Sequence, residues 1–209
     1  TLLDVGNRIQ FGRGGGENNT LGVYGGATLL NGNDVTFYGS NNAMIVDGVG
    51  STATLTGLDL GYNGSTGNHL TVSGGGLLDV GGTVSVQDTT MTRNRSERAG
   101  GGLETAAGTV DLADVDMTDN TTGDMPGNGG ALHLTGAAQV TWNGGTVTGN
   151  DAAAQGGGLW NSDTGLLVVI GVDVSDNTAP EGADVYNDGG IFLQDGLPVL
   201  PAALGLPVG

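Results

Sequence analysis

Residues 83–94 read TVSVQDTTMTRN, and versions of this twelve-residue block return along the chain. They read TATLTGLDLGYN at 52–63, TVDLADVDMTDN at 109–120, QVTWNGGTVTGN at 139–150 and LLVVIGVDVSDN at 166–177. Apolar residues recur at block positions 2, 4 and 9, and the last residue is always Asn. Alternation of apolar and polar residues at period two is typical of half-buried β-strands, so each block predicts strand structure that ends at a polar corner.

A second repeated element lies between the blocks: Gly-Gly, then Gly or Ala, then Leu. It occurs at 74–77, 100–103, 129–132 and 156–159, and a looser version, Gly-Ala-Asp-Val, stands at 182–185. By subtraction, the successive first residues are 26, 29, 27 and 26 positions apart. The whole chain therefore repeats with a unit of roughly 23 to 31 residues, which gives about eight units.

A unit this short cannot bury its own apolar face, so it must stack on its neighbours. No segment shows a sustained period of 3.6, which excludes parallel folds that need crossover helices. Coils stacked about 4.8 Å apart bury one continuous interior and pair the backbone sideways. We therefore predict an all-β, right-handed parallel β-helix (β-solenoid) of about eight coils over residues 1–196. An apolar, proline-rich cap or docking segment is expected at 197–209.

Glycine and asparagine have separate roles in this prediction. The glycine triplets are expected at tight corners, where the chain needs positive φ and close approach between coils. The Asn that ends each block is expected to point inward and to form a ladder of side-chain amides along the stack. Its predicted members are Asn63, Asn94, Asn120, Asn150 and Asn177.

Composition limits the partners that the chain can have. It carries 22 acidic residues against 5 basic ones, a net charge of −17, and all the basic residues are Arg. Such a surface repels phosphate backbones, so nucleic acid is not an expected partner. Cys is absent, which removes disulfides and thiol chemistry. No apolar run approaches the roughly 20 residues that span a bilayer, so no membrane span is expected.

Outward positions of the block carry the candidate binding face. Block positions 8 and 10 flank the inward position 9, and in earlier coils they correspond to Thr36 with Tyr38 and Asp59 with Gly61. In the later coils they give Thr90, Thr92, Asp116, Thr118, Thr146, Thr148, Asp173 and Ser175. Repeated Thr-x-Thr on a flat β-helix face resembles ice-binding proteins, whose hydroxyl and methyl array orders water. The alternative is that Thr is present because it favours strands and stacks well on itself.

The acidic residues around 114–124 suggest a second kind of site. Asp114, Asp116, Asp119 and Asp124 crowd one turn, and oxygen ligands suit Ca²⁺. Neither the EF-hand spacing nor the nonapeptide calcium repeat is present, and turn capping explains isolated Asp residues equally well. A structural Ca²⁺ ion is therefore one hypothesis, and no other cofactor is expected.

An enzymatic role is the weaker alternative. Arg93, Arg95 and Arg98 lie in one loop, one coil before the acidic cluster, and a polysaccharide lyase or hydrolase would need such groups to converge. The G-H-G and R-x-K signatures of β-helical pectinases are absent, so we expect no catalytic residues and assign these Arg residues to surface ion pairs.

The two tryptophans differ in their expected surroundings. Trp142 stands at an inward block position and is expected in the core. Trp160 follows the glycine triplet at 156–158, where partial burial at a corner is favoured over an exposed position that could stack on a sugar.

A family resemblance extends these expectations. The alternation of Gly-Gly-[Gly/Ala]-Leu with strands ending in [Val/Met]-[Thr/Ser]-x-Asn resembles the repeats of polymorphic outer-membrane proteins and autotransporter passengers. The resemblance covers roughly residues 74–190. It implies a secreted or outer cell-surface location and an adhesin-like, non-enzymatic role. The expected function is an adhesin, spacer or self-assembling subunit, with an end-to-end copy, a surface receptor or a glycan as partner.

Overall fold

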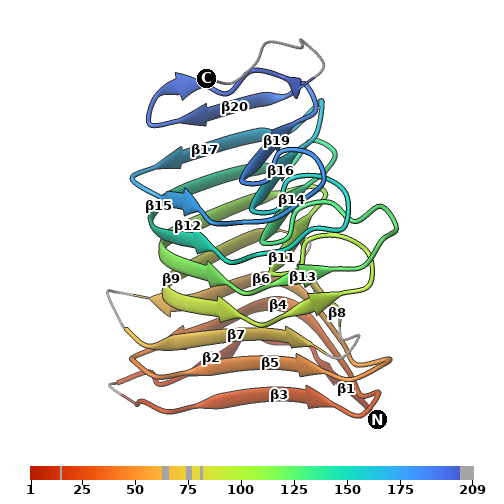
Figure 1. Cartoon of the computed structure of the whole chain (residues 1–209). Coiled ribbons are helices and arrows are strands. Elements are labelled where there is room, and N and C mark those ends of the chain that lie inside the picture. Colours follow the sequence, from red (N-terminus) through yellow and green to blue (C-terminus); the bar gives the residue numbers. More distant parts are fainter. Residues whose placement is uncertain (15, 63–65, 74–76, 81, 203–209) are drawn as a thin grey trace.

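The computed structural model describes residues 1–14, 16–62, 66–73, 77–80 and 82–202, and these residues form a parallel β-solenoid (Figure 1). Eight parallel strands follow one another in the main sheet, so the chain makes seven full turns from the first to the last. The predicted all-β parallel β-solenoid is confirmed, with seven turns where the repeats predict about eight coils. The Asn63 member of the predicted ladder lies outside the described residues.

Each turn has three sides. In the first four coils, side 1 comprises β1 (Leu2–Val5), the beginnings of β4 (Thr28–Tyr38) and β6 (Thr52–Tyr62), and β8 (Leu77–Val80). In the later coils it is a separate sheet of β11 (Leu103–Thr105), β14 (Leu132–Leu134), β16 (Leu159–Asn161) and β19 (Val185–Asn187). Side 2 comprises β2 (Ile9–Phe11), the ends of β4 and β6, the beginnings of β9 (Thr83–Thr92), β12 (Thr109–Thr118) and β15 (Gln139–Thr148), then β17 (Leu166–Ile170) and β20 (Ile191–Gln194).

Side 3 comprises β3 (Thr20–Tyr24), β5 (Ala43–Asp47), β7 (Asn68–Ser73), the ends of β9, β12 and β15, and β18 (Asp173–Ser175). The short strands β10 (Arg95–Ser96) and β13 (Thr121–Thr122) pair beyond side 3. The last strand, β21 (Leu197–Pro198), runs antiparallel to β20.

The long strands change from side 2 to side 3 through a single residue. Asp88 in β9, Asp114 in β12 and Gly144 in β15 occupy this corner with φ of 46°, 51° and 72°. Asp, Asn and Gly tolerate the left-handed region better than other residues, which explains why the sequence places Asp or Gly there. The apolar alternation restarts on the new side, and this is why block positions 2, 4 and 9 all point inward.

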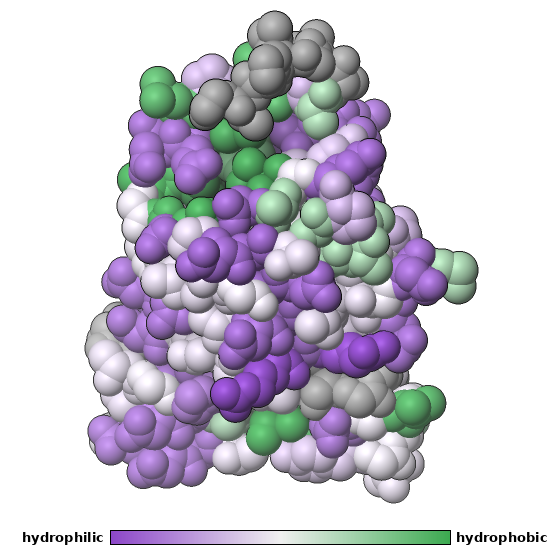
Figure 2. Space-filling view, viewed as in Figure 1, coloured by the Kyte–Doolittle hydropathy of each residue, from purple (hydrophilic) through white to green (hydrophobic). Residues whose placement is uncertain are grey.

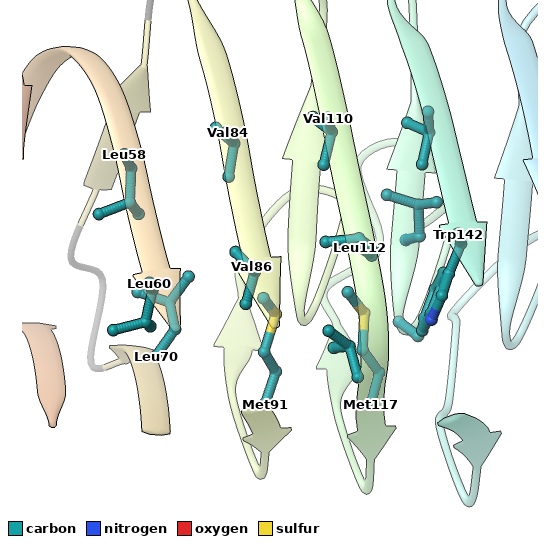
Figure 3. Close-up of a cluster of buried hydrophobic side chains, with 14 of the residues drawn as sticks. Leu58, Leu60, Leu70, Val84, Val86, Met91, Val110, Leu112, Met117 and Trp142 are labelled. Atoms are coloured by element: carbon teal, nitrogen blue, oxygen red, sulfur yellow. The ribbon is translucent and has the colours of Figure 1, made fainter. Parts of the chain in front are cut away.

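The interior is filled by apolar side chains stacked in columns along the solenoid axis (Figure 3). One column passes from Leu60 to Val86, Leu112 and Trp142 through successive parallel pairings. These four side chains are at most 1% exposed. Trp142 therefore lies in the core, as its block position predicts.

The register corrects one sequence alignment. Leu58 pairs with Val84 and Asp59 with Ser85, so residues 58–60 lie on side 2 opposite the first half of β9. The block at 52–63 had been aligned with 83–94 from its first residue, which would place Asp59 beside Thr90 on side 3. That alignment is wrong for the N-terminal coils. A period of two is the same on every side, so the pattern alone does not identify the side on which a strand lies.

The glycine triplets in the described coils combine positive φ with close approach. The first glycine of each, at 100, 129, 156 and 182, has φ between 60° and 67°. Where the second residue is Gly, at 101, 130 and 157, it has no room for a side chain: a Cβ on Gly157 would overlap the backbone of Ala183 and Thr178. Both expected roles of glycine are present, but at different positions of the triplet.

We expect Gly157→Ala to lower the free energy of unfolding by about 2–3 kcal/mol, because the new methyl group must displace backbone of the next coil. Urea denaturation followed by circular dichroism measures the change. Gly32→Ala is the matched control, since nothing lies within 4 Å of its Cβ position. Equal stability of the two variants would contradict the close approach at Gly157.

The two ends of the solenoid differ. At the C-terminal end, β21 folds back along the outer edge of β20, and the amide of Val199 donates to the carbonyl of Phe192 at 2.9 Å. The beginning of the segment expected to cap the solenoid thus lies on the last coil, and residues 203–209 lie outside the described part. At the N-terminal end, β1, β2 and β3 are each paired on one edge only within the described residues.

Candidate functional site

The predicted binding residues form two straight rows on side 3, the side that faces the viewer in Figures 1 and 2. Both rows arise because the parallel strands pair in register, which places residues at the same block position of successive coils next to one another. One row contains Thr90, Asp116, Thr146 and Asp173, and the other contains Thr92, Thr118, Thr148 and Ser175. Seven of these eight side chains are half-buried, and Asp173 is exposed. The structure therefore brings together these eight residues of the later coils, whereas Thr36 and Asp59, assigned to the same positions in the earlier coils, lie on side 2.

Hydrogen bonds link neighbouring coils within these rows. The Thr118 hydroxyl donates to the hydroxyl of Thr92 at 2.9 Å, and the Thr146 hydroxyl donates to the Asp116 carboxylate at 2.8 Å. Hydroxyl-bearing residues stand about 4.8 Å apart between coils and about 6.6 Å apart along a strand. The face is a regular grid of short hydroxyl and carboxylate side chains.

The predicted asparagine ladder is present at the far corner of side 3. Asn94, Asn120, Asn150 and Asn177 are at most 7% exposed. Each backbone amide and side-chain Nδ2 donates to Oδ1 of the next Asn at 2.9–3.0 Å. The ladder ends at Asp184, whose Oδ1 accepts both donors of Asn177. Because Asp carries no amide donor, the series stops there.

Two further ladders were not predicted. In the N-terminal coils, Asn19 donates to Asn42 and the amide of Asn42 donates to Asn68 Oδ1, at the corner that enters side 3. On side 1, Asn161 donates to Asn187 at 3.0 Å. Each of the similar segments 19–23, 42–46 and 68–72 begins with Asn. The sequence alone does not show on which side of the coil these Asn residues lie, because that depends on the register.

The four Asp residues of the calcium hypothesis are not gathered into one cluster among the described residues. Asp114 and Asp119 occupy the corners at either end of the side 3 segment of β12, Asp116 lies between them in the binding face, and Asp124 is exposed in the next loop. Among the described residues, no group of three or more His, Asp or Glu side chains is placed to hold a metal ion. The Asp residues are spread along the coil because two of them serve left-handed corners.

The arginine loop forms surface ion pairs. Arg93 and Asp119 lie 4.0 Å apart on adjacent coils, and Arg95 lies 3.8 Å from Glu97. These side chains are all more than half exposed, so the pairs contribute little to stability. Arg98 is different, since it lies 2.6 Å from Glu104 on side 1.

Side 1 carries an outward row that the sequence analysis missed. Register aligns Glu104, His133, Trp160 and Tyr186 on successive coils. His133 Nδ1 lies 3.0 Å from Glu104, and its ring packs against Trp160 in a tilted arrangement, with centroids 4.5 Å and planes 32° apart. Trp160 is 8% exposed and donates to Gln155. Trp160 is therefore buried within a strand of side 1, and not partly buried at a corner as the sequence favours; its neighbours became apparent only from the register.

The ionisation of Glu104 is coupled to this row. Burial alone would raise the pKa of its carboxyl, but the hydrogen bonds and charges of His133 and Arg98 outweigh burial and lower the pKa below its usual 4.5. A carboxyl whose pKa is lower in the folded state stabilises the fold above the unfolded pKa, and this stabilisation is lost as pH falls.

We expect Glu104→Gln to reduce stability by about 1–2 kcal/mol near pH 7, because it removes charge-assisted bonds to His133 and Arg98. The difference from the unmodified protein should shrink as pH falls below the usual 4.5, because protonation of Glu104 removes the same charge-assisted bonds. Denaturation curves measured across this pH range show whether the stability difference between the two proteins decreases as pH falls. Glu97→Gln is the control, since its carboxylate is 83% exposed, and a pH-independent loss at Glu104 would contradict the ionisation argument.

No protein-family model matches the sequence, and neither the curated proteins nor the solved structures include a significant match. Within the described ranges, no helix is long and apolar enough to cross a membrane.

Proposed function

We propose that this chain is a non-enzymatic, stiff structural segment of an extracellular or outer cell-surface protein, acting as a spacer that presents side 3 to a protein receptor or a glycan. The single observation that carries the proposal is the continuous parallel strand pairing, which runs from β1 and β2 to β20. The acidic net charge of −17 suits a protein that must remain soluble outside the cell.

Stiffness follows from the way the coils are joined. Each coil is hydrogen-bonded to the next along its strands, and the Asn ladders add side-chain bonds that run along the axis. A hinge would require a coil boundary without such bonds. Successive boundaries from β4 to β20 are all paired, so bending at one boundary would break several buried bonds at once.

Paired spin labels test the spacer. The chain has no Cys, so Gly32→Cys and Asp188→Cys give two specific sites just after the side 1 strands of their coils, about six strand spacings or 30 Å apart. We expect one narrow distance distribution that persists until the protein unfolds cooperatively. A broad or two-peaked distribution below the unfolding transition would show a hinge and overturn the spacer.

Ice binding is the second candidate, favoured by the two stacked rows on side 3. Thr118→Tyr and Thr148→Tyr would interrupt the grid, whereas Thr141→Tyr places the same bulk on side 2 of β15. If the face binds ice, thermal hysteresis is expected in the unmodified protein and in the side 2 variant, and its loss in both side 3 variants. Absence of hysteresis in the unmodified protein would eliminate this candidate and leave the spacer.

A further inference from the structure

A shallow groove of about 450 Å³ lies in the loops that connect side 3 to side 1. Residues from three successive coils line it. The apolar ones are small or rigid, and the polar ones are amides and a carboxylate. The described lining consists of Pro126, Asn128, Ala153, Ala154, Gln155, Pro180 and Glu181.

The polar residues of the groove stack on one another. Asn128, Gln155 and Glu181 pair in parallel from coil to coil, with a spacing of about 4.8 Å. Gln155 Nε2 donates to the Glu181 carboxylate at 2.8 Å, and the indole of Trp160 donates to Gln155 Oε1 at 3.2 Å. The amide of Gln155 is therefore held in one orientation, and the groove has a fixed polar edge.

Asn128 is the residue that points to a ligand. It is only 8% exposed, yet its side-chain amide makes no hydrogen bond to any described residue. The buried Asn residues of the ladder, in contrast, each donate to the next coil. Buried amides without a partner are unfavourable, and Asn128 lines the groove. Its donor and acceptor are therefore available to a molecule bound there.

Charge and backbone pairing restrict what this molecule can be. The described lining contains one carboxylate and no cationic side chain, and the chain carries a net charge of −17, so an acidic ligand would be repelled. A peptide strand would need an open backbone edge. Here the amides of Gly129 and Gly156 already donate to carbonyls of the next coil. The groove therefore favours a neutral ligand that bonds to side chains.

We infer that the groove binds a neutral glycan chain that lies along the solenoid axis. Asn128, Gln155 and Glu181 together offer the donors and acceptors that sugar hydroxyl groups require. Their spacing of about 4.8 Å is close to the length of one sugar unit in an extended chain, so successive sugars meet successive coils. Pro126 and Pro180 provide apolar surface for the C–H faces of the rings. This site is additional to the spacer, because it lies outside side 3.

The test uses immobilised neutral polysaccharides (glucan, mannan and xylan) and acidic ones (pectate and alginate). We expect the unmodified protein to be retained on a neutral polymer and on neither acidic one. In calorimetric titrations with a hexasaccharide of that polymer, Asn128→Ala should weaken binding at least about tenfold by removing the open amide. Ala153→Trp should do the same by filling the groove. Asn143→Ala is the matched control, since it removes an exposed amide from side 2 and should leave the affinity unchanged.

Circular dichroism establishes that each variant is folded. Retention on none of the neutral polymers would overturn the inference, and so would unchanged affinity in both folded groove variants. Retention of neutral dodecapeptides in place of polysaccharide would overturn it in favour of a protein partner. A glycan affinity that is lost in Thr148→Tyr and kept in both groove variants would assign the glycan to side 3, which overturns the groove and supports the proposed function. A hinge detected by the spin labels would overturn only the spacer.

Discussion

Asn120→Leu is expected to lower the free energy of unfolding by about 3–4 kcal/mol, although Leu has the same branched arrangement of side-chain heavy atoms as Asn. Asn120 is fully buried, and its Oδ1 accepts two bonds from Asn94 while its Nδ2 donates to Asn150 and to the Met91 carbonyl. The substitution removes all four bonds and leaves buried donors without acceptors, which costs more than the bonds themselves contribute. Urea denaturation measures the loss.

Asn143→Ala is the control for this ladder variant, because Asn143 is exposed on side 2 of β15. Its effect should stay within about 0.5 kcal/mol. If Asn120→Leu proved no more destabilising than Asn143→Ala, the apolar packing gained by Leu would offset the lost bonds, and the ladder would not be a source of stability.

Trp142→Ala is expected to cost about 3–5 kcal/mol. Trp142 is the largest of the fully buried side chains, with Leu112 on the preceding coil and Val169 on the next, and its Nε1 donates to the Gly144 carbonyl at 3.0 Å. Truncation would leave a cavity in the middle of a column whose neighbours are fixed by strand pairing, so the site cannot collapse readily. Calorimetry should show a lower unfolding temperature.

Trp142→Phe separates packing from hydrogen bonding in the same site. Phe keeps most of the ring volume but cannot donate to Gly144, so we expect a loss of about 1–2 kcal/mol. Losses of equal size for Ala and Phe would contradict the cavity argument, since the indole hydrogen bond would then account for the whole effect.

The sequence was sufficient for the fold because the same physical requirement repeats in every coil. Period-two apolar residues, glycine triplets and a terminal Asn all agree on a stacked coil, and the register then aligns Thr92 with Thr118 and Thr148 as block counting expected. The core position of Trp142 and the ladder from Asn94 to Asn177 follow from the same counting.

The features that could not be predicted from the sequence are those that depend on contacts between coils. The block at 52–63 matched in pattern but lies one side earlier, because inward positions are alike on every side. Glu104, His133 and Trp160 are 27 or more residues apart and meet only through register. The crowded Asp residues suggested calcium, yet the left-handed φ of Asp114 and Asp119 separates them.

The unequal coil lengths show where this architecture tolerates change in evolution and in engineering. From Asn94 to Asn120 the chain advances 26 residues, and from Asn120 to Asn150 it advances 30, yet the ladder bonds have the same length. Three of the four extra residues are accommodated in the loop that contains Asp124 and the exposed Met125, and the fourth lies between Leu134 and Gln139. That loop is therefore a natural insertion site, where a foreign epitope or an added recognition loop could be carried without changing the core or the register of the coils on either side.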